Sequence, residues 1–400
     1  MKILFLSQRF LFPMDSGGKI RTGKILEQLS KHHDITLISN IEPSKDDPYL
    51  AQIDKLCSKF VPVQWKEIRK FTPLFFLRLF FQMFSIYPVS VLNDYSKRLQ
   101  AAVEEELTKN SYDITICDFV QSALMFRNVK KIPTILFQHN VESMIAKRHI
   151  RQNNNILAKL FWWLQWKKML WFEKKVCNRF DTVIAVSEAD RNIFNKLYKT
   201  DNIKIIPTGV DVDYYKPIPN YKVKENSLVF CGSMDWLPNE DAMIFFIQDI
   251  LPVIKKKISD VSLTVVGRNP SPHLIKIIRE NPEIELTGWV EDTRPYIAQC
   301  ALFIVPIRIG GGTRMKIFEA MAMGKVVVST SIGAEGLPID NGKNIVIEDS
   351  PIVFAQKINE LLLPGNDRIS VESNALELVQ KNFTWSVVAK RFLDICDSLI

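Results

Sequence analysis

The chain has 400 residues, of which 47% are hydrophobic, and its 52 Lys and Arg residues exceed its 44 Asp and Glu residues to give a formal net charge of +8. This composition is typical of a globular protein and excludes a disordered chain. At roughly 100 to 200 residues per domain, the length predicts two or three domains and excludes a lone small binding module. The positive charge is spread along the chain, so we expect no nucleic-acid partner.

The six cysteines lie far apart in the sequence and include no CxxC pair. This spacing favours neither a zinc cluster nor a disulfide scaffold, and it predicts buried thiols in a reducing compartment. The N-terminal apolar run, residues 3–6, is too short for the core of a signal peptide. We therefore expect a cytoplasmic protein.

Short apolar runs alternate with helical patterns through the first half of the chain. Residues 2–7, 34–39, 112–117, 133–138 and 181–187 are predicted to be buried parallel strands. Repeated alternation of strands and helices predicts an α/β fold with a doubly wound sheet.

The alternation stops at residues 207–226, which contain three prolines and many polar residues, and we interpret this segment as a linker. A second set of strands follows, predicted at residues 227–232, 261–267, 284–288, 300–306 and 325–330. From residue 350 onward only helical patterns remain. The second half is therefore predicted to be another α/β domain, with ligands bound at the carboxyl ends of its strands.

Two apolar stretches, residues 71–92 and 156–172, are candidates for membrane spans, but both are interrupted. Pro73, Arg78 and Pro88 break the first stretch and three lysines break the second, whereas a span needs about 20 mostly apolar residues. The second stretch carries four tryptophans among its lysines: Trp162, Trp163, Trp166 and Trp171. Two interpretations stay open for it, docking on an anionic membrane surface and packing of a long helix within its own domain.

The loop at residues 307–324 gives the strongest signal for ligand binding. Its glycines, which include Gly311 and Gly312, allow the backbone to approach a ligand closely, and Thr313 is placed to cap the helix that follows. The N–H groups at such a helix start attract anions. Arg314 and Lys316 oppose the helix dipole, so their position makes most sense if an anion binds in front of them. The loop is predicted to hold a diphosphate.

Glu319 lies three residues beyond Lys316, on nearly the same face of the predicted helix. It is placed to accept hydrogen bonds from ribose hydroxyls. The alternative is a surface ion pair with Lys316.

The corresponding loop of the first half is residues 12–26, directly after the first predicted strand. Gly17 and Gly18 open a helix there, with Lys19 and Arg21 behind them. The loop is not a Walker sequence. Two interpretations stay open, a phosphate-binding loop and an ordinary helix start.

Residues 137–142 end another predicted strand and point His139, Asn140 and Glu142 toward the same edge of the sheet. We treat His139 and Asn140 as candidates for substrate contacts. A histidine at the end of a strand is also commonly an ordinary surface residue.

The series PTGVD at 207–211, TGWVEDTRPYIAQCALFIVP at 287–306 and FEAMAMGKVVVST at 318–330 resembles the retaining glycosyltransferases of family 4, also called glycosyl transferases group 1. The correspondence runs along nearly the whole chain. FPMDSGGKIR at 12–21, together with RIGGGTRMKIFEAMAMG at 308–324, further resembles a subgroup of sugar transferases associated with bacterial exopolysaccharide systems.

The resemblance implies the GT-B fold, in which two Rossmann-like domains face each other across a cleft. In this family the N-terminal domain, here residues 1–206, holds the acceptor. The C-terminal domain, here residues 227–383 after the linker 207–226, holds a nucleotide-diphosphate sugar. The final helix, 384–400, is expected to cross back onto the first domain.

The family's functional residues can be placed by the same resemblance. Glu319 matches the ribose-binding glutamate, and Arg314 and Lys316 match residues that hold the diphosphate and stabilise it as it leaves. His139 matches the histidine that contacts the donor sugar near its reacting carbon. The glycine loop beside the phosphate and sugar is matched by Gly17 and Gly18.

The chain departs from the family pattern at two places. Eight residues before Glu319 the family commonly has a second glutamate, and this chain has Gly311. The usual Arg and Lys after the first strand of the second domain are replaced by Ser233 and Asn239. Residues 211–213 spell DxD, but they lie in the linker, so we expect neither an essential metal nor another cofactor. Cationic side chains and the helix terminus are expected to stabilise the leaving diphosphate instead.

The sequence thus predicts transfer of a sugar from a nucleotide-sugar donor to a glycan or a lipid-linked glycan acceptor, with retention of configuration. The enzyme would work in polysaccharide synthesis, in the cytoplasm or on the inner face of the plasma membrane. Two alternatives stay open: a nucleotide-sugar epimerase of the same fold, and a protein that binds a nucleotide sugar or glycolipid without catalysis.

Overall fold

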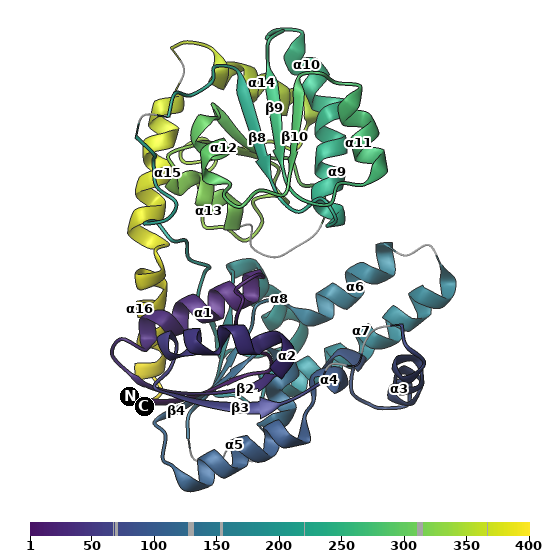
Figure 1. The fold of residues 1–400 in the computed structure, drawn as a ribbon, viewed down its shortest axis with the longest axis vertical. Helices are drawn as coiled ribbons and strands as arrows, with labels where there is room; N and C mark the ends of the chain where they lie inside the picture. Colours follow the sequence, from purple (N-terminus) through teal and green to yellow (C-terminus); the bar gives the residue numbers. More distant parts are fainter. Residues whose placement is uncertain are drawn as a thin grey trace. The chain divides into compact units, whose positions relative to one another are not determined.

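The computed structural model describes residues 1–66, 68, 71–126, 132–152, 155–219, 221–309, 315–365 and 367–400. These residues form two compact units (Figure 1). The first unit comprises Met1–Pro207 and Val388–Ile400, and the second comprises Thr208–Val387. Each unit is built around its own parallel sheet, so the predicted α/β fold class is confirmed.

The first unit contains a seven-stranded sheet in the order β3-β2-β1-β4-β5-β6-β7, and every pair of neighbouring strands is parallel. The strands are β1 (Lys2–Ser7), β2 (Asp34–Ile41), β3 (Lys59–Gln64), β4 (Ile114–Asp118), β5 (Thr134–Phe137), β6 (Thr182–Ala185) and β7 (Ile203–Ile205). Every residue of β4, β5 and β6 is buried, which explains why these strands are apolar or β-branched throughout except for Asp118 at the end of β4.

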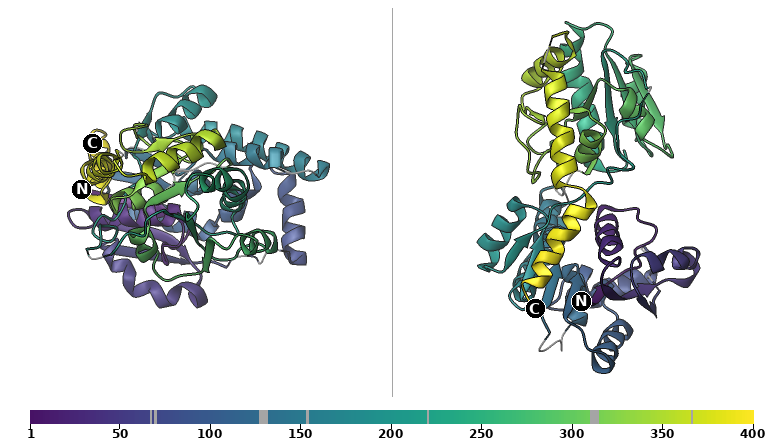
Figure 2. Two further views of the ribbon diagram at one scale, coloured as in Figure 1. Left: turned by 90° about the horizontal axis from the view of Figure 1, so that it is seen from above. Right: turned by 90° about the vertical axis from the view of Figure 1, so that its left-hand side faces the viewer.

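Helices cover both faces of this sheet, with α1 on one face and α5 on the other (Figure 1). The helices of the first unit are α1 (Gly17–Leu29), α2 (Pro43–Asp46), η1 (Asp47–Lys55), α3 (Pro73–Met83), α4 (Val89–Asp94), α5 (Lys97–Lys109), η2 (Val120–Met125), α6 (Glu142–Gln152), α7 (Ile156–Cys177) and α8 (Glu188–Tyr198). Most of α16 (Trp385–Asp397) also belongs to this unit. Its Phe392 is fully buried, with its ring centroid 5.3 Å from that of Phe137 on β5, and both ends of the chain lie on this unit (Figure 2).

The second unit contains a six-stranded parallel sheet in the order β10-β9-β8-β11-β12-β13. Its strands are β8 (Ser227–Cys231), β9 (Ser262–Val266), β10 (Ile284–Gly288), β11 (Leu302–Val305), β12 (Val326–Ser329) and β13 (Val346–Ile347). Its helices are α9 (Leu237–Phe245), η3 (Phe246–Ile250), α10 (Leu251–Lys255), α11 (Pro272–Arg279), α12 (Arg294–Gln299), α13 (Met315–Ala322), α14 (Pro351–Leu362) and α15 (Arg368–Asn382). The buried apolar side chains of this unit form one core, whose members lie between Val210 and Phe383 in the sequence.

Each strand predicted from the sequence has a counterpart, and three further strands were missed. The missed strands are β3, β7 and β13, and each lies at an edge of its sheet. An edge strand pairs on one side only, so it has no need of a continuous apolar run. In β3, five of six residues are at least partly exposed and Pro62 is tolerated.

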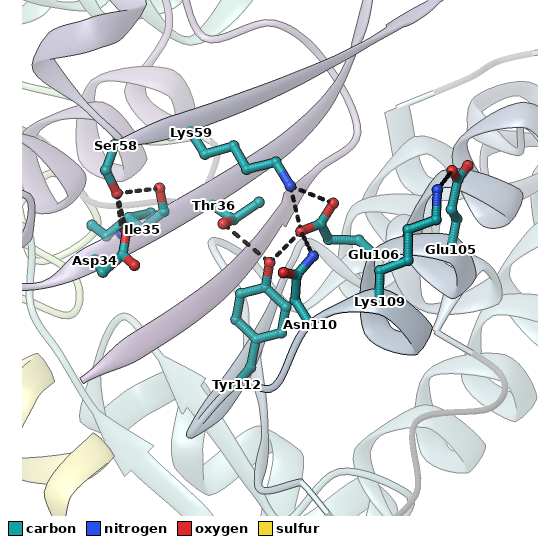
Figure 3. Close-up of polar contacts among 10 residues, drawn as sticks. All are labelled: Asp34, Ile35, Thr36, Ser58, Lys59, Glu105, Glu106, Lys109, Asn110 and Tyr112. Carbon is teal, nitrogen blue, oxygen red and sulfur yellow. Dashed lines mark hydrogen bonds and ion pairs between the residues drawn. The ribbon is translucent and has the colours of Figure 1, made fainter.

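A network of polar side chains holds the edge strand β3 against α5 (Figure 3). Lys59 of β3 donates to Glu106 of α5 at 2.7 Å, and Tyr112 and Asn110 donate to the same carboxylate at 2.6 and 2.7 Å. Burial opposes the charge on Glu106, but the hydrogen bonds from Lys59 and Tyr112 dominate and lower its pKa. Tyr112 also donates to Thr36 on β2 at 3.1 Å, so the network spans two strands and a helix.

The chain enters and leaves the second unit at one place. Val210 donates its backbone N–H to the carbonyl of Phe383 at 2.8 Å and forms a parallel bridge with Thr384. A Cβ atom on Gly209 would lie only 2.6 Å from the ring of Trp385, so a side chain is excluded there. The predicted linker, residues 207–226, thus begins with a segment that packs on the end of the second unit.

All six cysteines are buried and unpaired, as the sequence predicted. Within the described ranges, no helix combines the length and the apolarity that crossing a membrane requires. Two of the four tryptophans of α7 pack inside the unit: Trp162 stacks on His149 with centroids 4.1 Å apart, and the indole nitrogen of Trp166 is buried. Trp163 and Trp171 remain 46% and 43% exposed.

Candidate functional site

The predicted site residues lie just after the carboxyl ends of strands in each unit. His139 and Asn140 follow β5, whereas Lys316 and Glu319 lie on α13, the helix that follows β11. In open parallel sheets this edge is where ligands bind, because the strand-to-helix loops and the helix N-termini gather there.

In the first unit, His139 forms a buried group with Asp118 and Thr22. The Nε2 atom of His139 lies 2.7 Å from Oδ1 of Asp118, the last residue of β4. The Thr22 hydroxyl, on α1, donates to the same carboxylate at 3.1 and 3.2 Å and lies 3.3 Å from Nε2 of His139. Side chains from three different elements therefore converge at one edge of the sheet.

The contact with Asp118 determines which nitrogen of His139 carries the proton. Burial lowers the pKa of His139, and the attraction of Asp118 only partly opposes this, so the ring is neutral near pH 7. A carboxylate only accepts hydrogen bonds, so Nε2 must be the protonated nitrogen. Nδ1 is then a bare acceptor, and it is buried with no hydrogen-bond partner in the described part of the chain. A substrate hydroxyl could satisfy it.

Phe119 closes this group from one side and explains why glycine is needed in α1. Its backbone has a positive φ of 62°, and its ring stacks on His139 with centroids 4.1 Å apart. A Cβ atom on Gly18 would lie 2.6 Å from the tip of that ring. Gly18 is therefore required at least for close packing of α1 against the His139 group.

The other predicted residues of this unit have mixed surroundings. Gly17 is exposed at the start of α1 and Asn140 is half-buried. Arg21 is buried and donates to the carbonyl oxygens of Gln138 and Ile206, so it fastens α1 to the sheet and is not available to a phosphate. Lys19 is ion-paired with Asp15 at 3.3 Å.

Glu142, the first residue of α6, shares its surroundings with a second carboxylate. Burial and the nearby charge of Glu173 raise the pKa of Glu142 to about 8. Burial likewise raises the pKa of Glu173, although this carboxylate accepts the backbone N–H groups of Glu142 and Ser143 at 2.9 and 3.1 Å. Glu173 thereby caps the helix start, and Glu142 is largely protonated at neutral pH.

In the second unit, two glycines bring the backbone together where β8 and β9 end. Gly232 donates its N–H to Val266 at 2.9 Å. A Cβ atom on Gly267 would lie 1.8 Å from the carbonyl oxygen of Gly232, and one on Gly232 would lie 2.7 Å from Nζ of Lys316. Glycine at both positions keeps this edge open for the lysine.

Lys316 extends from α13 to the carboxyl end of β8. Its Nζ donates to Oδ1 of Asn239 at 3.1 Å and lies 4.3 Å from the ring centroid of Phe230. Asn239 is buried and fixed in turn, because its amide donates to the carbonyl of Ser233 at 2.8 Å. An amide and an aromatic face attract an ammonium group without carrying a charge of their own, and Glu319 on the same helix interacts electrostatically with Lys316.

Glu319 lies one turn further along α13 and is half-buried. Burial raises its pKa to about 7, although Lys316 and a hydrogen bond with Tyr215 both act to lower it. Burial and Glu319 in turn raise the pKa of the Tyr215 hydroxyl. The carboxylate therefore has a phenol as a hydrogen-bond partner within its own unit.

Four predicted residues, Gly311, Gly312, Thr313 and Arg314, lie outside the described residues. Arg308, just before them, forms an ion pair with Asp241 at 2.8 Å and stacks on the ring of Phe245. The described part of the predicted diphosphate site is thus Lys316 with its supporting residues.

The sequence did not single out Asp118, Thr22, Phe119 or Tyr215. Asp118 follows a predicted strand directly, so its position at a strand end could have marked it as a candidate site residue. Phe119 and Tyr215 gave none, because an aromatic side chain in a loop is usually part of the core. Asn239 was noted only as a replacement for the usual basic residue.

The DxD residues are exposed or half-buried, and Asp211 accepts the N–H of Tyr214 at 3.1 Å in a local turn. Among the residues that the structure describes, no three His, Cys, Asp or Glu side chains are grouped so as to hold a metal ion.

Two family models match the chain and together cover most of it. The model described as Glycosyltransferase Family 4 matches residues 17–214, and the one described as Glycosyl transferases group 1 matches residues 225–363. A 44.6 kDa protein in the cps region of Klebsiella pneumoniae is 23% identical over 393 residues, which is 96% of each chain.

Solved structures share the fold over the whole length. Sucrose-phosphate synthase of Thermosynechococcus elongatus has a TM-score of 0.72 at 15% identity and covers 100% of this chain and 99% of its own. HepE of Anabaena, crystallised with UDP and glucose, has a TM-score of 0.67 at 16% identity and covers 100% of both chains. The two matched models, the order of the strands in both sheets and this likeness lead to one conclusion: the chain belongs to glycosyltransferase family 4 (group 1) and is a glycosyltransferase with the two-domain, Rossmann-like GT-B fold.

Proposed function

We propose that this glycosyltransferase moves a sugar from a nucleotide-diphosphate donor to a hydroxyl of a glycan or lipid-linked glycan, with retention of configuration, in the synthesis of a cell-surface polysaccharide. The observation that carries the proposal is Lys316, held by Asn239 and the ring of Phe230 where Gly232 leaves room beside it. The UDP and glucose bound by HepE support a nucleotide-sugar donor. The cps-region relative supports a role in polysaccharide synthesis.

The second unit is assigned the donor's nucleotide. Lys316, with Arg314 from outside the described residues, would neutralise the diphosphate, and Glu319 would accept hydrogen bonds from the ribose. Tyr215 already occupies part of the hydrogen-bonding capacity of Glu319, but a carboxylate can accept several hydrogen bonds. Donor binding therefore does not require Tyr215 to leave.

The first unit is assigned the sugar and the acceptor. The bare Nδ1 of His139 would accept a hydrogen bond from a sugar hydroxyl, and Asn140, half-buried beside it, would supply a second polar contact. Gly17 and Gly18 would let the backbone approach the sugar and phosphate. Asp118 holds the imidazole in the required tautomer.

The reaction breaks the bond between the sugar's anomeric carbon and the diphosphate oxygen and forms a bond from that carbon to the acceptor oxygen on the same face, while the proton of the acceptor hydroxyl passes to the leaving diphosphate. Negative charge grows on the leaving diphosphate, and positive charge grows on the sugar. A preorganised cation is worth most at the leaving group, because it costs no reorganisation during the reaction. We expect Lys316 to act there, with no essential metal.

The test begins with a thermal-shift screen of the full chain against UDP, GDP, ADP and TDP, since a ligand held by the native state raises the melting temperature. The nucleotide sugar carrying the responding base is then incubated with glycan acceptors, and the anomeric configuration of the product is read by NMR. A retained linkage supports the proposal, whereas an inverted linkage contradicts retention.

Two versions of the same assay, one without acceptor and one with a broad acceptor panel, separate the two alternatives. A donor whose sugar becomes epimerised identifies a nucleotide-sugar epimerase. A donor that is bound but neither transferred nor hydrolysed, across a broad acceptor panel, identifies a binding protein.

A further inference from the structure

Helix α3 has two polar side chains, Arg78 and Gln82, directed into the protein, whereas most of its apolar side chains are exposed. Arg78 donates to the carbonyl of Leu92 at 2.8 Å, and Gln82 is buried and donates to Oδ1 of Asn93 at 3.0 Å. The outer side consists of side chains that are each more than half exposed: Leu74, Phe76, Leu77, Phe80, Phe81 and Phe84. A surface helix normally has the reverse arrangement.

This outward side is a continuous apolar surface. Leu74, Leu77, Phe81 and Phe84 are spaced by three or four residues, so they follow one face of the helix. Phe80 stacks edge-on with both Phe81 and Phe84, at centroid distances of 5.7 and 5.2 Å. Exposed apolar surface of this kind marks an interaction site far more often than does a single exposed Leu or Phe.

The first turns of α7 add to the same flank of the first unit. Ile156, Leu157 and Leu160 are 80%, 76% and 60% exposed. Helix α7 is joined to the end of α3, because Lys168 donates to the carbonyl of Met83 at 2.8 Å, and the two helices are neighbours in Figure 1.

The charged residues in the sequence segments that form this flank are all basic. No Asp or Glu occurs in residues 68–93 or in residues 143–172. The second of these segments carries six basic residues: Lys147, Arg148, Arg151, Lys159, Lys167 and Lys168. Lys159 and Lys167 are exposed, and Nζ of Lys167 lies 4.7 Å from the ring centroid of Trp166. Exposed aromatic and aliphatic groups next to exposed lysines match the boundary of an anionic bilayer, with acyl chains below and phosphate groups above.

We propose that α3 and the first turns of α7, named here the apolar flank (residues 71–86 and 156–163), dock on the surface of a bilayer that contains anionic lipid. With 11 residues, α3 is too short to span a bilayer and would lie in its interface. The contact surface differs from the one that the tryptophan pattern of α7 suggested, because Trp162 and Trp166 pack against α6. The proposal rests on the proposed function only in that a lipid-linked acceptor gives the enzyme a reason to be at a membrane.

The test is co-sedimentation of the full chain with vesicles of phosphatidylglycerol mixed with phosphatidylethanolamine, compared with vesicles of phosphatidylcholine. We expect binding to the anionic vesicles that weakens with added salt. Leu77→Glu combined with Phe81→Glu should reduce the partition coefficient about 100-fold, at about tenfold for each side chain kept out of the apolar phase. The matched control is Ile352→Glu with Ile369→Glu, which makes the same charge change at two exposed apolar positions of α14 and α15 in the second unit.

Each outcome decides the proposal. Loss of binding by the flank variant alone supports it. Absence of binding by the wild type, or an equal loss in the control, overturns it. A wild-type dimer that the flank variant converts to monomer, without vesicle binding, would overturn it in favour of contact with a second copy. The nucleotide thermal shift is measured on the same samples: vesicle binding without any nucleotide response would contradict the proposed function and leave the apolar flank standing.

Discussion

The two groups of candidate residues occupy equivalent edges of two similar sheets, yet their chemistry differs. In the first unit, His139, Asp118 and Thr22 form a buried group whose hydrogen bonds are mostly internal. In the second unit, Lys316 contacts an amide and an aromatic ring and interacts electrostatically with Glu319 on its own helix. One group is suited to reading hydroxyls and the other to holding an anion.

This difference shows how one kind of fold serves two ligands. The strand ends and glycines are shared features that bring backbone and side chains to the edge of the sheet. The identity of a few residues then decides whether that edge presents a neutral acceptor or a cation.

The largest effect is expected for Lys316→Ala, which removes the described cation that is assigned to the diphosphate. We expect turnover to fall by a factor of about 10² to 10³, as it does when one hydrogen-bond donor is removed from an oxyanion hole. The same fall is expected for Arg314→Ala. Turnover with the responding nucleotide sugar is the measurement. Lys357→Ala, at an exposed ion pair on α14, is the control and should retain activity. Wild-type turnover in both cationic variants would remove the diphosphate assignment.

A smaller effect is expected for Asp118→Asn, which no longer fixes the tautomer of His139. The loss of one hydrogen bond to the substrate should lower kcat/KM about 10- to 100-fold. Nucleotide binding, measured by thermal shift, should be unchanged because the second unit is intact. Asp113→Asn, at the other end of β4, is the matched control. If Asp118→Asn weakens nucleotide binding as much as it slows transfer, the division of roles is wrong.

Protonation of Glu142 predicts a pH dependence of stability. Because its pKa is raised to about 8, the folded protein binds this proton more tightly than the unfolded chain does, so the free energy of unfolding falls as the pH rises from about 4.5 to about 8. Glu142→Gln should remove part of that fall. At about pH 8.5 we expect it to raise the free energy of unfolding by about 1 to 2 kcal/mol, after allowance for solvent screening.

Urea unfolding at about pH 5 and about pH 8.5 measures this effect, and the variant and the wild type should differ little at the lower pH. Glu188→Gln, at the exposed first residue of α8, is the control. An equal gain in the control would show that the cause is general charge and not the pairing of Glu142 with Glu173.

The smallest effect is expected on removing divalent metal. If Lys316 and the helix start carry the charge of the leaving group, transfer should be within about twofold of its initial rate after treatment with EDTA. Loss of activity that Mg²⁺ or Mn²⁺ restores would contradict the assignment of leaving-group stabilisation to side chains alone.

The sequence predicted both sheets because their central strands are buried on both faces and need continuous apolar runs. It did not show β3, β7 and β13, whose edge positions relax that requirement. The outward apolar face of α3 was likewise hidden. The composition of residues 71–92 was visible, but which side of the helix meets solvent depends on Leu92 and Asn93, and hence on packing.

Among the candidate residues, the sequence placed His139 and Lys316 at strand ends but could not reveal their neighbours. Asp118 lies 21 positions before His139, and Asn239 lies 77 positions before Lys316. Such partners are brought together only by the order of strands in the sheet. The inward turn of Arg21 was unpredictable for the same reason, since its acceptors are the backbones of Gln138 and Ile206.

The division of the first unit into two separated segments has a consequence for biosynthesis. Phe392, which fills a place beside Phe137, leaves the ribosome only after the entire second unit has been made. Thr208–Val387 can therefore mature first, while the earlier-translated unit waits with part of its interior uncovered. A nascent chain that stalls before Val388 has emerged would carry a finished second unit joined to an incomplete and aggregation-prone first one.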